Sequence, residues 1–153
     1  MRTHVEIRPA QPQDADSLIE FNLRMATETE GKQLDRGIVT LGINEILQDA
    51  SRGFYLVAEV EGEIAGALMV TTEWSDWRNA AFWWIQSVYV VPEFRRQGVF
   101  RALYGEAKER ARCADRVCGC RLYVERENAP ALATYTRLGL TETNYRVFEE
   151  LFQ

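Results

Sequence analysis

The stretch "VYVVPEFRRQGVFRALYGEA", Val88 to Ala107, decides the fold, because it joins a strand to a helix through a short basic turn. Its first residues are β-branched or aromatic, which favours a strand, and Pro92 ends that strand because proline has no N–H to donate. From about Gly98 to Cys113 the apolar residues recur at helical spacing. The stretch therefore predicts a strand that runs directly into a helix, as in α/β proteins.

The turn itself has the chemistry of an anion site. The first backbone N–H groups of a helix have no partner within the helix, so they bind anions such as phosphate. Gly98 lets a ligand approach the backbone, and three arginines add positive charge to the turn: Arg95, Arg96 and Arg101. A solvated basic turn with a glycine for packing explains the same residues, since the Lys-Ser/Thr pair of a Walker loop is absent. The turn alone leaves both interpretations open.

The rest of the chain alternates predicted strands and helices. Strands are expected over residues 4–10, 54–60, 64–74, 80–91, 120–125 and 145–152. One helix begins at Asp14 or Asp16, and its helical pattern ends within residues 27–33. Other helices cover about 36–51, 98–113 and 128–139. The order β-α-α-β-β-β-α-β-α-β fits one mixed α/β sheet with helices on both faces, so we expect a single domain over residues 1–153.

Composition narrows the function classes. The net charge of −5 argues against broad nucleic-acid binding and favours a cationic small molecule. No apolar run approaches the roughly 20 residues of a membrane span, and the start lacks a signal peptide, so no membrane partner and a cytoplasmic location are expected. The three cysteines are expected to be reduced thiols, and with a single histidine, His4, we expect no metal site.

Two motifs carry a family resemblance. Val90, Pro92 and "RRQGVF" (95–100) match an Arg/Gln-x-x-Gly-x-Gly/Ala loop after a V-x-P strand end. Downstream, "N-x-x-A-x-x-x-Y-x-x-x-G" is present at Asn128, Ala131, Tyr135 and Gly139, with Leu140 where phenylalanine is common. On both motifs the chain resembles the GNAT superfamily of acetyl-coenzyme A dependent N-acetyltransferases over nearly its whole length. The resemblance implies a mostly antiparallel mixed sheet and an acyltransferase that uses acetyl-coenzyme A as acetyl donor, without a metal.

The resemblance also implies roles for particular residues. Main-chain amides of the loop hold the coenzyme A pyrophosphate, and the residues concerned are Arg95, which opens the loop, and Arg96, Gln97, Gly98, Val99, Phe100 and Arg101. The backbone of Val88, Tyr89 and Val90 pairs with the pantetheine arm, and Asn128 contacts that arm or orders the next helix. Phe100 departs from the pattern, because the family usually has Gly or Ala there.

The reaction assigns further roles. Tyr135 resembles the phenol that protonates the departing thiolate, since a phenol with a pKa of about 10 is protonated at neutral pH. The thioester carbonyl is expected to meet the Val90 N–H, as in an oxyanion hole. No clear base precedes the loop, where Gln86 and Ser87 stand. The candidates elsewhere are Glu73, Asp76, Glu28 and Glu30, and the preferred account is deprotonation through water with no single essential base.

The acceptor side is predicted from aromatic residues. Trp74, Trp77, Trp83 and Trp84 lie close together, and strand alternation sends Trp83 and Trp84 to opposite faces. A wall of such rings, with carboxylates nearby, suits a small cationic primary amine. The candidate acceptor residues are Glu28, Glu73, Trp74, Asp76 and Trp84. Homodimer contacts explain exposed aromatics equally well.

Two other function classes remain as alternatives. A coenzyme-binding regulatory domain that lacks catalysis fits the missing base and Phe100, whereas the presence of Tyr135 opposes it. A nucleic-acid-binding domain centred on the arginines of the turn is disfavoured by the acidic overall charge.

Overall fold

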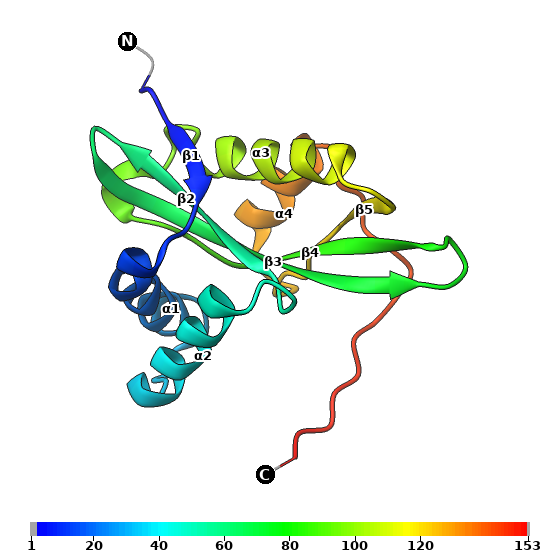
Figure 1. Ribbon diagram of the computed structural model, residues 1–153, viewed down its shortest axis with the longest axis horizontal. Coiled ribbons are helices and arrows are strands. Elements are labelled where there is room, and N and C mark those ends of the chain that lie inside the picture. The colour runs from blue at the N-terminus through cyan, green and yellow to red at the C-terminus, as the bar shows by residue number, and fades with distance from the viewer. Residues whose placement is uncertain (1–2, 153) are drawn as a thin grey trace. The chain divides into compact units, whose positions relative to one another are not determined.

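The computed structural model describes residues 3–152 of the chain. These divide into two compact units, Met1–Leu122 and Tyr123–Gln153. Among the described residues, the first unit holds a five-stranded sheet, three α-helices and two short 3-10 helices, Pro12–Asp14 and Pro92–Phe94, and the second holds one α-helix (Figure 1). The expectation of a single domain over the whole chain stays a prediction.

The sheet follows the order β1-β2-β3-β4-β5. Its strands are β1 (Glu6–Pro9), β2 (Phe54–Val60), β3 (Glu63–Ser75), β4 (Ala80–Val90) and β5 (Val117–Arg121). Neighbouring strands are antiparallel, except that β4 and β5 are parallel. The mixed, mostly antiparallel sheet is therefore confirmed.

Helices cover both faces of this sheet, as predicted (Figure 1). On one face lie α1 (Ala15–Glu30) and α2 (Arg36–Gln48), and on the other lies α3 (Val99–Cys113). Alternation along β2 explains the two layers, because Tyr55 and Val57 pack in the cluster with Leu18 and Ile43 of the helices, while the next residues turn to the α3 side. On the α3 side, Leu103 is completely buried.

The ends of the first two helices have identifiable causes. Asp14 precedes α1, but its carboxylate does not cap the helix and instead accepts bonds from Arg8 at 2.8 and 3.0 Å. Gly31, with φ of +63°, ends α1 within residues 27–33, where the end of this helix was predicted. α2 ends at Gln48, before the predicted Ser51, because the Asp49 carboxylate binds the Ser51 amide and hydroxyl and turns the chain.

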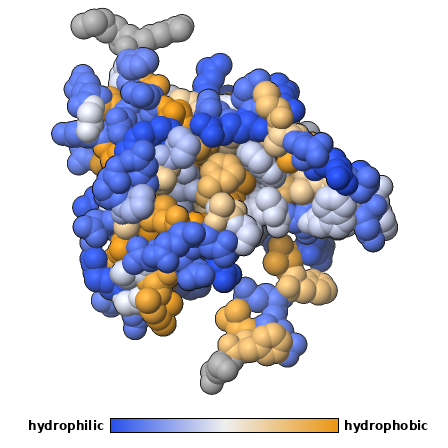
Figure 2. All heavy atoms as spheres, viewed as in Figure 1, coloured by the Kyte–Doolittle hydropathy of each residue, from blue (hydrophilic) through white to orange (hydrophobic). Residues whose placement is uncertain are grey.

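One apolar part of α2 reaches the surface. Ile38 and Leu41 are 70% and 72% exposed, and Figure 2 shows orange side chains over this helix at the lower left. They lie one turn apart, on the side of α2 that faces away from the sheet. α2 is therefore apolar on its outer side as well as on its core side.

The last two strand predictions need correction. β5 covers Val117–Arg121 rather than 120–125, because its pairing with β4 runs from Val117 opposite Ala81 to Arg121 opposite Trp84. The strand expected over 145–152 is wrong, since no residue from 138 to 152 lies in a helix or strand. Alternation of apolar residues suits a strand, but a strand also needs a neighbour that takes its backbone hydrogen bonds.

The second unit contains α4 (Ala129–Arg137). Asn128 caps it by accepting the Ala131 N–H at 3.2 Å, and Pro130 lies in its first turn. Gly139 follows its end with φ of +96°. The predicted helix over 128–139 is therefore confirmed with its cap.

Candidate active site

The turn before α3 has the geometry of an anion cradle. Arg96 and Gly98 have φ of +64° and +84°, so the backbone curls before Val99 begins the helix. No side chain caps this helix end, which leaves the first N–H groups without a side-chain acceptor. A Cβ placed on Gly98 would meet no described atom within 4 Å, so the space in front of the turn is open. The geometry fits a pyrophosphate group held by main-chain amides.

Arginine side chains surround this cradle and Phe100 lies beside it. Arg95, Arg96, Gln97 and Arg101 are all exposed. Arg95 is held by Glu28 and the Val90 carbonyl, and Gln97 Nε2 donates to the Glu93 carbonyl, so Arg96 and Arg101 are the side chains of this group best suited to a bound anion. The Phe100 ring stacks along α3 against Tyr104, with the ring centres 6.2 Å apart. The side chain that departs from the family pattern is therefore packed on its own helix.

β4 carries a bulge next to its open edge. Ala67 pairs with Tyr89 and Met69 with Gln86, so Leu68 of β3 faces two residues of β4, Ser87 and Val88. Ser87 has φ of +49°, which is uncommon for a residue other than glycine. A bulge at this place re-aims the side chains of β4.

Beyond the bulge, Val90 presents its backbone to the outer edge of the strand. The Val91 N–H bonds the Ala65 carbonyl at 2.8 Å, which makes Val90 and Gly66 a non-hydrogen-bonded pair. The N–H and C=O of Val90 therefore point away from β3. Within the described first unit, β5 pairs only with residues 81–84 of β4, so it leaves this part of the edge open. An extended polar chain such as pantetheine can pair there.

Glu28, Tyr89 and Arg95 form one cluster, although they were predicted for separate roles. Glu28 accepts from the Tyr89 hydroxyl at 2.9 Å and from Arg95 Nη2 at 2.8 Å, while Arg95 Nε donates to the Val90 carbonyl at 2.8 Å. The hydrogen bond from Arg95 lowers the pKa of Glu28. Burial, and then the bond to Glu28, raise the pKa of Tyr89. The cluster ties the end of α1 to the open edge of β4.

The predicted aromatic wall is divided between the two faces of the sheet. Trp84 pairs with Thr71 on the α1–α2 side, and its Nε1 donates to Glu73 at 3.3 Å. Trp83 lies on the other face, where its ring centre is 5.3 Å from that of Phe54. The prediction that Trp83 and Trp84 point to opposite faces is thus confirmed.

The two carboxylates predicted near this wall already have partners. Glu73 accepts from Arg121 Nη1 at 2.7 Å, and Asp76 accepts from the Trp77 N–H at 2.9 Å. Trp74 is 58% exposed and, one residue along from Glu73, lies on the opposite face of β3. Among the five candidate acceptor residues, Glu73 and Trp84 are brought together, Glu28 lies in the cluster described above, and Trp74 points to the other face.

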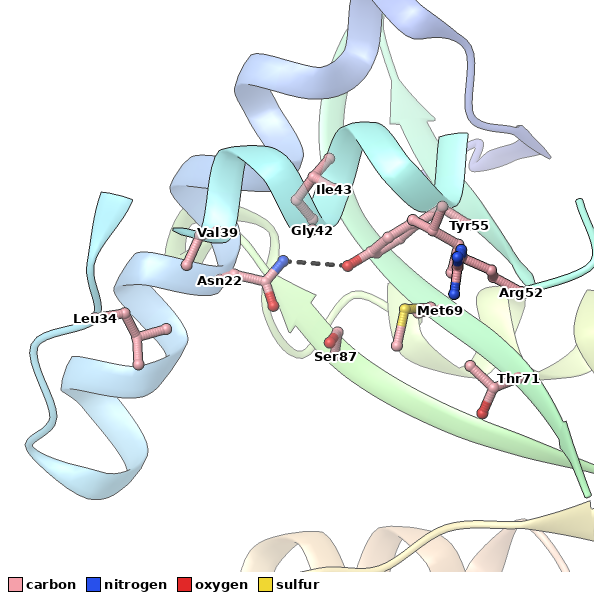
Figure 3. A pocket seen from close by; sticks show the side chains of 11 residues that line it. Asn22, Leu34, Val39, Gly42, Ile43, Arg52, Tyr55, Met69, Thr71 and Ser87 are labelled. Atoms are coloured by element: carbon pink, nitrogen blue, oxygen red, sulfur yellow. Dashed lines mark hydrogen bonds between the residues drawn. The ribbon is translucent and has the colours of Figure 1, made fainter. Parts of the chain in front are cut away.

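A pocket between α1, α2 and the sheet was missed by the sequence analysis (Figure 3). Its volume is about 360 Å³, and its lining residues are Asn22, Leu34, Val39, Gly42, Ile43, Ile46, Arg52, Tyr55, Met69, Thr71 and Ser87. Asn22 donates to the Tyr55 hydroxyl at 3.2 Å, and burial raises the pKa of Tyr55. The signal in the sequence is Asn22 itself, a polar residue inside the apolar run of α1.

The second unit carries the two downstream motif residues. Asn128 orders the start of α4, which is one of the two roles expected for it. Tyr135 lies on α4, and burial raises the pKa of its hydroxyl. The phenol is therefore protonated at neutral pH, as an acid must be, and its catalytic role stays a prediction.

Residues 3–152 show neither a cluster of metal ligands nor a membrane-spanning helix. No three of the His, Cys, Asp or Glu side chains in this range come together as metal ligands. Cys113, Cys118 and Cys120 are free thiols. None of the helices in the same range has the length and apolar character needed to cross a membrane.

Comparisons with known proteins identify a matching family and similar structures. A family profile described as "Acetyltransferase (GNAT) family" matches residues 19–140. A possible acetyltransferase from Clostridium difficile 630 is 43% identical with a TM-score of 0.91, over 97% of this chain and 98% of that one. No curated protein matches the chain in sequence.

Two more distant solved structures share the fold alone. The aminoglycoside N-acetyltransferase AAC(6')-Iy in complex with CoA is 17% identical with a TM-score of 0.78, over 99% of this chain and 97% of that one. The ribosomal-protein-alanine N-acetyltransferase from Brucella melitensis biovar Abortus 2308 is 16% identical with a TM-score of 0.76, over 98% and 100%.

Proposed function

The chain belongs to the acetyltransferase (GNAT) family, and on that premise we propose that it transfers the acetyl group of acetyl-coenzyme A to the primary amine of a small molecule. One observation carries the proposal, namely that β4 contributes to two neighbouring sites. Its Ser87 lines the pocket of about 360 Å³, and three residues later the Val90 backbone faces the open edge of the strand. A coenzyme along that edge and an amine in the pocket would meet on one strand.

The residues of the turn fit the coenzyme. The uncapped amides at the start of α3 and the open space at Gly98 suit a pyrophosphate, and Arg96 and Arg101 add positive charge to the turn. Arg95, which opens the turn, is held by Glu28 and the Val90 carbonyl. When bound, acetyl-coenzyme A supplies the thioester whose C–S bond breaks as the amine nitrogen forms the new amide. A solved relative of the same fold binds CoA, which supports the assignment.

The chain's own groups would handle the charges and protons of this exchange. The Val90 N–H, which points away from β3, would donate to the carbonyl oxygen of the thioester, as an oxyanion hole does. Tyr135 is the proposed proton donor to the leaving sulfur. Glu28 is a poor base, because the bond from Arg95 lowers the pKa of its carboxyl group. The ammonium group of the acceptor would instead lose its proton through water, with no single essential base.

The pocket supports a small acceptor. A volume of about 360 Å³ lies at the lower end of the roughly 300–1,000 Å³ typical of small-molecule sites. Most lining side chains are apolar, and the uncharged polar ones, Asn22, Tyr55, Thr71 and Ser87, can orient one amine. Arg52 also lines the pocket, and its charge is paired with Glu45 and Asp49. Solved proteins of this fold include both an aminoglycoside and a ribosomal-protein acetyltransferase, so the pocket rather than the fold favours a small amine. The net charge of −5 favours an acceptor that is cationic in solution.

Filling the pocket tests this proposal. Gly42 lines the pocket, and a Cβ there meets no described atom within 4 Å, so Gly42→Leu adds a side chain at the pocket wall without a clash at its Cβ. Gly105→Leu is the matched control, because Gly105 is also helical with no described atom within 4 Å, but lies on α3. We expect Gly42→Leu to lower kcat/KM for the best amine of a panel by about 10-fold or more, with the acetyl-coenzyme A Kd unchanged. Equal activity of both variants would place the acceptor elsewhere.

A coenzyme-binding regulatory domain is the alternative function. It is favoured by the pocket lining, which contains no carboxylate among the described residues. Isothermal titration with acetyl-coenzyme A, followed by thiol release with pooled amines, separates the two functions. Binding without release would support the regulatory domain, and no binding would defeat both. The cytoplasmic setting and the homodimer expected from the sequence belong to the same proposal, and the free thiols support the former.

A further inference from the structure

Among the described residues that line the pocket between α1, α2 and the sheet, one side chain is charged. It is Arg52, which lies between the end of α2 and the start of β2, and no carboxylate is part of the same lining. Figure 3 shows Arg52 beside Tyr55 and Met69 at one end of the pocket, with Leu34 toward the other end. The charged group that an acceptor meets in this pocket is therefore a cation.

Two carboxylates hold the Arg52 guanidinium from outside the pocket. Arg52 Nε donates to Glu45 at 3.0 Å and lies 3.4 Å from Asp49 Oδ2, and neither of these acidic residues lines the pocket. A guanidinium has five N–H donors, of which one is on Nε and four are on the two Nη atoms. Within residues 3–152, neither Nη atom of Arg52 makes a hydrogen bond. Arg52 is thus held through Nε and keeps its Nη donors for a ligand.

Arg52 and Ser87 lie at different levels of the sheet. Tyr55 of β2 pairs with Met69 of β3, which pairs with Gln86 of β4, and β2 and β4 run in the same direction. Arg52 comes before this level and Ser87 comes after it. Since Ser87 is on β4, the strand with the proposed coenzyme edge, the pocket suits a ligand with its amine toward Ser87 and an anionic group at Arg52.

We propose that the amine acceptor also carries a carboxylate, and that Arg52 is the residue that selects it. The inference rests on the proposed function, because it takes the pocket as the acceptor site. Hydrogen bonds between arginine and carboxylate are charge-assisted and commonly bidentate, so they fix the direction of a ligand as well as its position. A carboxylate held by Arg52 would direct the amine of the same molecule toward Ser87. The acceptor class is that of small amino acids rather than of simple amines or polyamines.

The acidic net charge of the chain is compatible with this class. The net charge of −5 acts on the protonated amine at long range, and salt screens such interactions beyond about 8–10 Å. Arg52 acts at contact distance, on a ligand that is already in the pocket. A small amino acid carries both an ammonium group and a carboxylate at neutral pH, so one molecule satisfies both charges.

Arg110 offers a matched control for Arg52. Its Nε donates to Glu106 at 2.9 Å, much as Arg52 Nε donates to Glu45, and both arginine side chains are partly exposed. Arg110 lies on α3, on the face of the sheet opposite α1 and α2. Arg110→Gln therefore removes a similar ion pair and leaves the pocket unchanged.

The test compares acceptors that differ by one carboxylate, namely alanine with ethylamine, phenylalanine with phenethylamine, and lysine with cadaverine. Each kcat/KM is referred to the free amine, so that differences in amine pKa cancel. We expect wild type to have a kcat/KM about 10-fold or more higher for the carboxylated member of at least one pair. Arg52→Gln should remove this preference by raising the KM of that member about 10- to 100-fold, the loss of one hydrogen bond between charged groups.

The other measurements separate recognition from a general loss of activity. In Arg52→Gln the kcat/KM of the plain amine should change by no more than about 2-fold, Arg52→Lys should keep part of the preference, and Arg110→Gln should keep all of it. Urea unfolding checks that each variant is folded, and the comparison of the pairs in wild type needs no variant.

Three results would overturn the inference and leave acetyl transfer to amines standing. They are equal kcat/KM values within every pair, activity confined to amines without a carboxylate, and an equal loss for both members of a pair in Arg52→Gln. Transfer to no amine at all would instead defeat the proposed function, and the acceptor class with it.

Discussion

Gly98→Ala separates the coenzyme cradle from simple backbone strain. Gly98 has φ of +84° and its added Cβ meets no described atom within 4 Å, so the folded chain bears only the left-handed strain. That strain costs about 1–2 kcal/mol of unfolding free energy. Gly62, in the turn between β2 and β3, has φ of +81° with the same open space, so Gly62→Ala carries the same strain away from the turn.

The effect on coenzyme binding should differ between these variants. A phosphate bound by the amides of this turn would approach the open space at Gly98, where the added Cβ would crowd it. One lost hydrogen bond to a charged group is worth about 1.5–3 kcal/mol. We therefore expect Gly98→Ala to raise the acetyl-coenzyme A Kd by about 10- to 100-fold, and Gly62→Ala to leave it unchanged. Isothermal titration measures both Kd values, and urea unfolding checks that the stability losses match. Equal Kd values for the two variants would refute the cradle.

Three further predictions concern the acid, the stability of the first unit, and the tryptophans. Tyr135→Phe should lower kcat by about 100-fold or more while the coenzyme Kd is kept, which stopped-flow kinetics with titration will measure; an unchanged kcat removes the acid role. Asp14→Asn should lower the unfolding free energy by about 1.5–3 kcal/mol at neutral pH, because Asp14 is 5% exposed and accepts two bonds from Arg8. Arg8 lowers the pKa of Asp14 in the folded chain, so this stabilisation is present above the ordinary pKa of 3.8 and is lost as the pH falls through the lowered value; urea unfolding should show wild type and variant converging in acid, and a constant difference would contradict the linkage. Trp74→Ala should change kcat/KM across an amine panel by no more than about 2-fold, since Trp74 lies on the face of β3 opposite Thr71 of the pocket. A larger loss of activity would mean that Trp74 contacts the acceptor.

Local patterns were enough to predict most of the fold. Pro92 and Gly98 marked the ends of β4 and the start of α3, and Asn128 marked the start of α4, because caps and breakers act within a few residues. The strand expected over 145–152 was wrong for a physical reason. Its alternation is local, but a strand forms only where a partner edge is available.

The site was predictable only in its local parts. The basic turn followed from neighbouring residues, whereas the pocket is assembled from Asn22, Tyr55 and Ser87 on three separate elements. The bulge that turns Ser87 into the pocket depends on the register between β3 and β4, which alternation does not specify. The Glu28–Arg95 pair likewise joins residues 67 positions apart. Spacing within one motif gives no signal for such contacts.

The most direct test of the central proposal is the release of coenzyme A thiol from acetyl-coenzyme A in the presence of pooled small amines, aminoglycosides and N-terminal peptides. We predict release that requires both enzyme and amine, with one N-acetylated product from a small amine found by mass spectrometry. Binding of acetyl-coenzyme A with no amine-dependent thiol release from any pool would contradict the account.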